Sequence, residues 1–159
     1  MKKLDTQSVE IIGRNRLINE LLYAGIENAM SARDRGLDLV AYVDLNDQLD
    51  YFAAVPIQMK ASSTRAFGID RKYEKFPHLV MAFVWHVASP VDAVTYAMTY
   101  KDLHAIAEEM GYTKTPSWTQ RNGYSSSNPS KLVIERFEQH RMTPEKWWEL
   151  VTRRNIAGS

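Results

Sequence analysis

The sequence predicts an α/β domain, in which helices cover a β-sheet. Three observations favour this class: a segment of helical period opens the chain, apolar runs of strand length follow, and the last third carries helix-start signals. The chain has 159 residues, of which 45% are hydrophobic, enough for one sizeable core. A single domain over residues 1–159 is therefore expected.

The first expected helix covers residues 8–24. Apolar side chains recur there at helical spacing, and Gly25 follows at a position where a left-handed residue commonly ends a helix. We expect the apolar side of this helix to pack on the core. That side is formed by Ile11, Ile18, Leu21 and Leu22.

Strands are expected after the helix. Residues 26–30 predict a short edge strand, and residues 37–43 and 51–61 predict two more, joined by a turn over residues 45–50. Pro56 marks an edge or a bulge in the third strand, because proline cannot donate a hydrogen bond within a sheet.

The second half of the chain begins with a continuous apolar run, residues 78–87 (HLVMAFVWHV), which is typical of a strand buried on both faces. Residues 93–99 predict a further strand, followed by a helix that ends at Gly111. Residues 112–127 read as a polar loop. Two more helices are expected, each with proline at its first position, at Pro129 and Pro144.

Composition excludes several classes of protein. The chain has no cysteine, which rules out disulfides and thiolate zinc sites and fits a cytoplasmic protein. The charged and polar first residues, MKKLDTQSVE, show no secretory signal. The longest apolar run is too short to span a bilayer, so no membrane partner is expected. The net charge of +1 does not by itself indicate a nucleic-acid binder.

The charges are nevertheless unevenly distributed. Residues 36–54 contain four acids and no lysine or arginine. Residues 60–75 contain five bases and two acids, and residues 111–131 contain three bases and no acid. An acidic pocket beside basic loops suits a metal-dependent enzyme that acts on a polyanion, although ordinary charge scatter is the alternative explanation.

Three polar side chains are expected to meet at one place on the sheet. Alternate residues of a strand share a face, so Gln58 and Lys60 project to the same side. If the strands 37–43 and 51–61 are neighbours, Asp38 joins them. A carboxylate, an amide oxygen and an ammonium group at one point can hold a hard divalent cation and a phosphate.

This order of elements resembles the core of the PD-(D/E)XK, or restriction-endonuclease-like, superfamily over roughly residues 8–100. The matching residues are the helix, then GLDLV with Asp38, then IQMKAS with Gln58 and Lys60. The resemblance implies a mixed central sheet flanked by helices, with a nuclease core over about 8–110 and a helical extension over 111–159. It also implies that Asp38 and Gln58 bind Mg²⁺ or Mn²⁺, and that Lys60 positions the attacking water and the phosphate.

The sequence departs from the family pattern at two positions. Gln58 stands where the family has an acid, as in some homing and Holliday-junction-type relatives that carry Gln-x-Lys. The family also often places a glutamate after the glycine of the first helix, where this chain has Asn15. Asn15 is taken as the helix ligand, and Glu10 stays open as the alternative because it offers a carboxylate. With two neutral ligands, a weak or absent metal site is also a live hypothesis.

The expected function is hydrolysis of phosphodiester bonds in DNA by a Mg²⁺-dependent endonuclease. Four residues in the basic segments are expected to contact the nucleic acid, and a homodimer is left open because dimers are common where both strands of a duplex are cut. The alternative is a catalytically weak or inactive module of the same fold that binds nucleic acid or a protein partner. The nucleic-acid contacts are Ser62, Arg65, Lys114 and Arg121.

Overall fold

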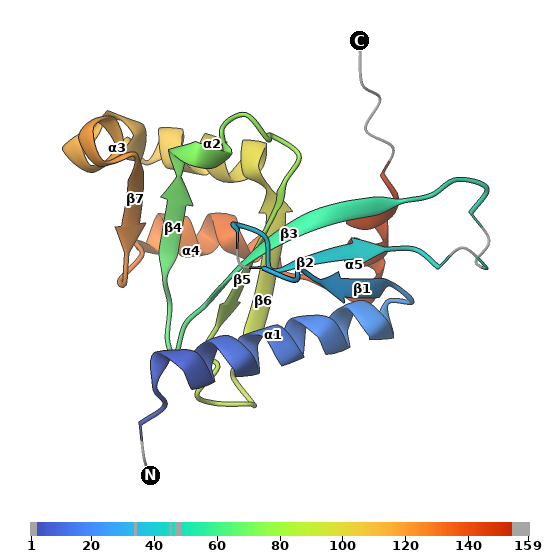
Figure 1. Cartoon of the computed structure of the whole chain (residues 1–159). Helices are drawn as coiled ribbons and strands as arrows, with labels where there is room; N and C mark the ends of the chain where they lie inside the picture. Colours follow the sequence, from blue (N-terminus) through green and yellow to red (C-terminus); the bar gives the residue numbers. More distant parts are fainter. Residues whose placement is uncertain (1–2, 34, 45, 47–48, 154–159) are drawn as a thin grey trace.

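A five-stranded mixed sheet forms the centre of the molecule (Figure 1), which confirms the predicted α/β class. The computed structural model describes residues 3–33, 35–44, 46 and 49–153. The order of strands in the sheet is β1-β2-β3-β5-β6; β3 and β5 are parallel, and every other neighbouring pair is antiparallel. The strands are β1 (Glu27–Met30), β2 (Leu39–Tyr42), β3 (Ala54–Ala61), β5 (Val80–Trp85) and β6 (Val94–Thr99).

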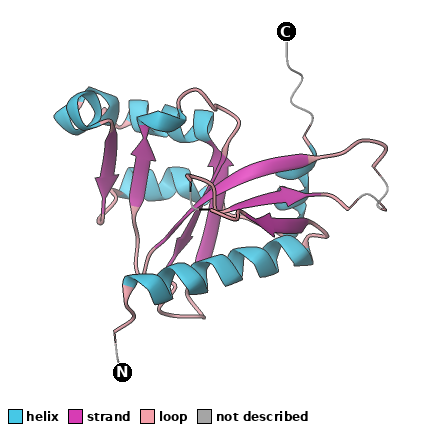
Figure 2. Ribbon diagram, in the orientation of Figure 1, coloured by secondary structure: helices cyan, strands magenta, loops and turns pink. Residues whose placement is uncertain are grey.

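The two faces of the sheet are covered by different elements (Figure 2). The first face packs against α1 (Thr6–Tyr23) and α5 (Pro144–Thr152). The second face packs against a two-stranded antiparallel ribbon of β4 (Phe67–Asp70) and β7 (Gly123–Ser126), together with three helices. These helices are α2 (Tyr100–Glu109), α3 (Pro116–Arg121) and α4 (Lys131–Glu138), with short 3₁₀ turns η1 (Arg71–Tyr73) and η2 (Tyr112–Lys114) between elements.

Strand β5 lies at the centre of both cores, as its continuous apolar run predicts. All six of its residues are buried. Val80, Ala82 and Val84 face the core under α1, whereas its other three residues face the aromatic core on the second face. Strand β3 is different, because only one of its faces is apolar. Its buried residues Val55, Ile57 and Met59 belong to the first core.

The apolar face expected for the first helix is right for Leu21, which is buried, and for Ile18, which packs against the core. It is wrong for Ile11 and Leu22, which are 42% and 49% exposed. The other buried residues of α1 are Val9, Gly13 and Leu17. Apolar side chains occur on all sides of this helix, so their spacing does not single out the packed side. The deciding contact is the crossing of α1 over β3 at Gly13.

The crossing at Gly13 is unusually close. A Cβ atom on Gly13 would lie 2.5 Å from the Cβ of Ala61 and 3.6 Å from the sulfur of Met59. Glycine within a helix costs about 0.5–1 kcal/mol relative to alanine. Because Gly13 has no side chain, the backbone of α1 can pack directly against the end of β3.

The polar segment 112–127 is more ordered than its composition predicts. It contains η2, α3 and β7. Its strand has the sequence GYSS, without the apolar alternation of a core strand, and is held by pairing with β4, whose existence the sequence analysis also missed. In the predicted turn 45–50, Leu45, Asp47 and Gln48 lie outside the described residues. None of the described helices has the length and hydropathy needed to cross a membrane.

Gly13→Ala is expected to lower the free energy of unfolding by about 1–3 kcal/mol, because the new methyl group collides with a Cβ that cannot rotate away. Urea unfolding measures the change. Adding Ala61→Gly to this variant removes the collision and is expected to recover part of the loss. Asn15→Ala, on the exposed side of the same helix, serves as control. If Gly13→Ala were as stable as the wild type, α1 could not pack as closely against Ala61 of β3 as the structure shows.

Candidate functional site

The site forms where β3 continues beyond the start of β2. The two strands pair antiparallel, which confirms that the two predicted runs are neighbours. Asp38 directly precedes β2; its backbone N–H donates to the carbonyl of Ile57 at 3.0 Å. The N–H of Met59 then donates to Oδ2 of the Asp38 carboxylate at 2.7 Å. The Asp38 carboxylate thus accepts the hydrogen bond that a backbone carbonyl of a neighbouring strand would otherwise accept from Met59. This hydrogen bond holds the carboxylate against the edge of β3.

Gln58 lies on the second face of β3 and is held by Tyr73 from η1. The Tyr73 hydroxyl lies 3.4 Å from Oε1 of Gln58 and 3.0 Å from the carbonyl oxygen of Gly36. Nε2 of Gln58 donates to the carbonyl of Met59 at 3.3 Å. The amide is therefore positioned by contacts with a tyrosine and with the backbone of its own strand.

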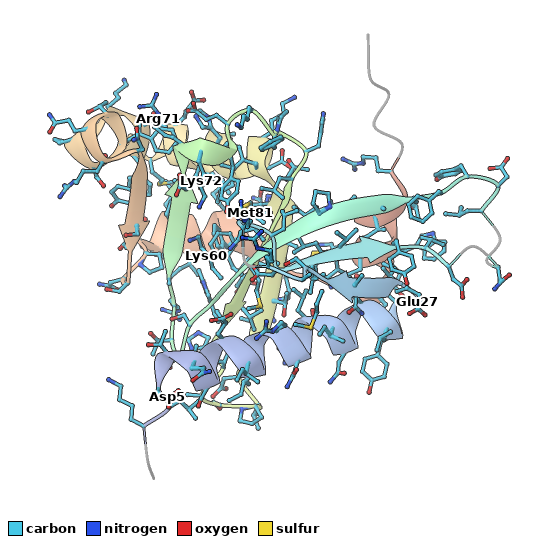
Figure 3. The ribbon with its side chains drawn as sticks, in the orientation of Figure 1. Asp5, Glu27, Lys60, Arg71, Lys72 and Met81 are labelled. Carbon is cyan, nitrogen blue, oxygen red and sulfur yellow. The ribbon has the colours of Figure 1, made fainter. Side chains whose placement is uncertain are left out.

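Lys60 is a residue of β3, and its side chain lies against β4 near the centre of the molecule (Figure 3). A Cβ on Gly68 of β4 would lie 3.1–3.3 Å from the Cε, Cδ and Nζ atoms of Lys60. Gly68 thus leaves the room that the lysine occupies. Burial lowers the pKa of Lys60 from its ordinary value of 10.5, and the nearby carboxylates of Asp70 and Asp38 oppose this shift.

One cavity of about 420 Å³ brings the predicted residues together. Asp38, Gln58 and Lys60 all line it. A second cavity of about 290 Å³ adjoins it, sharing Lys60, Gly68 and Ser125. The second cavity also has Arg121 and Ser117 from α3 in its wall. The result is a hollow with acids at both ends, because Asp70 lines the second cavity together with Arg121.

Of the two candidates on the first helix, the geometry favours Glu10. Glu10 lines the cavity of Asp38, whereas Asn15 is exposed and does not line it. The reason is the register fixed by Gly13: Glu10 is near the side of α1 that faces β3, and Asn15 is on the opposite side. The Glu10 side chain is 54% exposed and lies 3.9 Å from Arg14, so it stands at the rim of the cavity.

The four predicted nucleic-acid contacts separate in the structure. Arg121 lines the second cavity beside Lys60. Ser62, Arg65 and Lys114 line neither cavity. The hydroxyl of Ser62 accepts a hydrogen bond from Thr64 N–H at 3.3 Å, as expected for a turn. The sequence analysis missed Gly68 and Ser125 as lining residues, because they reach the site through the long-range pairing of β4 with β7.

The donors at the cavity suit a hard cation. Asp38 and Glu10 supply carboxylate oxygens and Gln58 supplies an amide oxygen. Within the described part of the chain, no group of three or more His, Cys, Asp or Glu residues could hold a metal. Mg²⁺ is commonly held by one or two carboxylates, with water and substrate phosphates completing its shell. The residues therefore fit such an open site and do not form a closed cage.

Comparisons of the chain with protein-family models, curated proteins and solved structures gave no match.

Lys60→Met is expected to raise the free energy of unfolding at neutral pH by about 1 kcal/mol, because the variant has no buried ammonium group to desolvate. Between the lowered pKa of the folded state and 10.5, the folded protein has released a proton that the unfolded chain still binds. Wild-type stability therefore rises with pH across this window, and the advantage of the variant shrinks.

Urea unfolding at neutral and alkaline pH measures this difference. Lys72→Met is the control, because the Lys72 side chain is 61% exposed and the same substitution there relieves little burial. A Lys60→Met protein that is less stable than the wild type at neutral pH would contradict a costly burial of the Lys60 ammonium group. A difference in stability that does not change with pH would contradict the lowered pKa of Lys60.

Proposed function

We propose that this protein is a Mg²⁺- or Mn²⁺-dependent endonuclease that hydrolyses phosphodiester bonds in DNA. The observation that carries the proposal is the convergence of Asp38, Gln58, Lys60 and Glu10 on one cavity. The resemblance of the same segments to the PD-(D/E)XK superfamily supports it. A cytoplasmic location belongs to the same proposal.

Each residue has a definite role in the proposed reaction. Asp38, Gln58 and Glu10 would hold the cation. A divalent cation there would neutralise phosphate charge and lower the pKa of a bound water. Asp38 is suited to this role because its carboxylate is held rigidly by the N–H of Met59. Asn15, the helix ligand inferred from the sequence, has no role in this arrangement because it does not line the cavity.

Lys60 is proposed to act on the phosphate and on the attacking water. Its ammonium group can donate hydrogen bonds to a non-bridging phosphate oxygen and to the water. In a partly buried site these interactions are stronger than in bulk water. The oxygen of the attacking water bonds to phosphorus as the bond from phosphorus to the ester oxygen breaks. The attacking water loses one proton to solvent water, and the leaving oxygen takes up one proton from solvent water.

The adjoining cavity supplies a place for the neighbouring phosphate of the strand. Arg121 can pair with a phosphate, and the hydroxyl group of Ser125 can donate to its oxygens. The Ser117 hydroxyl already donates its one proton to the carbonyl of Gly123 at 2.7 Å, so it lines the cavity without donating to the phosphate. Lys60 and Arg121 are the cationic side chains of the hollow, whereas Asp38, Glu10 and Asp70 also line it, so a bound divalent cation would have to supply the rest of the positive charge that a nucleic-acid backbone requires.

A second candidate is a module of the same fold that binds nucleic acid with little or no catalysis. The observation in its favour is the neutral Gln58, which leaves Asp38 and the half-exposed Glu10 as the carboxylates in the wall of the cavity. Because metal affinity rises with ligand charge, such a site binds metal more weakly than one with three acids.

A plasmid-cleavage assay with Mg²⁺ or Mn²⁺ tests the proposal. Asp38→Asn removes the charge but keeps an oxygen acceptor for the N–H of Met59, so the fold is preserved. We expect this variant and Lys60→Met to lose activity by roughly 100-fold or more. Glu10→Gln is expected to lose roughly 10–100-fold, whereas Asn15→Ala, on the same helix, is expected to cleave like the wild type.

Two outcomes would contradict the enzyme. Cleavage that persists in Asp38→Asn would show that another site is responsible. Salt-sensitive DNA binding by the wild type, without cleavage in either metal, would favour the binding module.

A further inference from the structure

A third cavity, of about 540 Å³, lies beside the first half of β3 and is not used by the proposed reaction. Its walls are mostly apolar or aromatic, and three basic side chains line it as well. A pocket with apolar walls and a few polar groups is the usual form of a site for a small molecule or for part of a larger ligand. The walls include Leu37, Pro56, Tyr73, Phe76, Pro77 and Leu79. The basic residues are Arg35, Lys75 and His78.

This cavity adjoins the proposed active site. Tyr73 lines it, and the hydroxyl of the same tyrosine lies 3.4 Å from Oε1 of Gln58. Pro56 lies two residues before Gln58 on the same face of β3, a separation of about 6.6 Å along a strand. On the other strand, Gly36 and Leu37 in its wall directly precede Asp38. The two cavities are thus separated by little more than the Gln58–Tyr73 contact.

The exposed aromatic ring in this cavity is Phe76. The residue is 53% exposed although it is large and apolar. The Nζ atom of Lys75 lies 5.4 Å from the centroid of the ring. An open aromatic ring beside a cation is the combination with which proteins stack a nucleobase and hold its phosphate.

We propose that this cavity receives the nucleobase of a nucleotide next to the scissile phosphate, with Phe76 stacking on the base and Arg35 and Lys75 pairing with its phosphate. The inference rests on the proposed function and names its substrate class. Bases within a duplex are stacked and paired, and their removal from the helix costs free energy. The preferred substrate is therefore DNA with unpaired nucleotides, such as a single strand or the single-stranded part of a branched molecule.

Binding of fluorescein-labelled oligothymidylate, measured by fluorescence anisotropy in EDTA, tests this inference without cleavage. Ala54→Trp places an indole in the cavity from an exposed position of β3. Phe76→Ala removes the stacking ring. Both are expected to weaken binding by roughly tenfold. Ala29→Trp, at an exposed alanine of β1 outside the cavity, is the matched control and is expected to bind like the wild type.

A labelled duplex of the same length forms the second arm of the experiment. We expect the duplex to bind the wild type more weakly than the single strand and to be insensitive to both cavity variants. Unchanged single-strand binding in the two variants, equal losses for both forms of DNA, or no single-strand binding by the wild type would each overturn the inference. The proposed nuclease activity is tested separately by the cleavage assay. If the wild type cleaves no DNA in Mg²⁺ or Mn²⁺, but Ala54→Trp and Phe76→Ala still weaken its binding of single-stranded DNA, the proposed function fails and the base-binding cavity stands.

Discussion

The close crossing of α1 over β3 is the constraint on which the rest of the site depends. Because Gly13 has no side chain, the helix lies directly against Ala61 at the end of the strand. One turn earlier, Glu10 comes to the rim of the cavity that holds Asp38, Gln58 and Lys60. A helix displaced outward by one methyl group would move that carboxylate away from the other three side chains. Gly13 weakens the helix locally, but its missing side chain allows the close crossing that brings Glu10 to the cavity.

The second requirement is the unequal length of β2 and β3. β2 begins at Leu39, opposite Ile57, so the last residues of β3 have no backbone partner on that side. The carboxylate of Asp38 accepts the N–H of Met59, which satisfies the strand and holds the acid in place. On the other face of β3, Gly68 leaves space for Lys60. Strand pairing and strand ends therefore determine where the polar side chains meet.

The sequence predicts much of this arrangement and fails where distant segments meet. The alternation in β3 and the acid before β2 are local patterns, so Asp38, Gln58 and Lys60 were found from them. The choice between Asn15 and Glu10 depended on which side of α1 packs on the sheet. The sequence does not show that side, because apolar residues occur all around the helix. The pairing of β4 with β7 brings together residues more than fifty positions apart without an apolar pattern to announce it. Ser117 and Arg121 lie in a segment whose composition predicts a polar loop, so their positions in α3 were not expected. The basic residues of that segment did suggest contact with a polyanion.

The central claim is that Asp38, Gln58 and Glu10 hold a divalent cation beside Lys60. The most direct measurement is a titration of the isotope-labelled protein with Mn²⁺, followed by the loss of backbone amide signals near the paramagnetic ion. We expect the signals of Met59, Lys60 and Gly68 to broaden first, Asp38→Asn to abolish this effect, and Gln58→Glu to tighten Mn²⁺ binding by about tenfold. Broadening centred on other acidic residues, or broadening at the cavity that persists in Asp38→Asn, would contradict it.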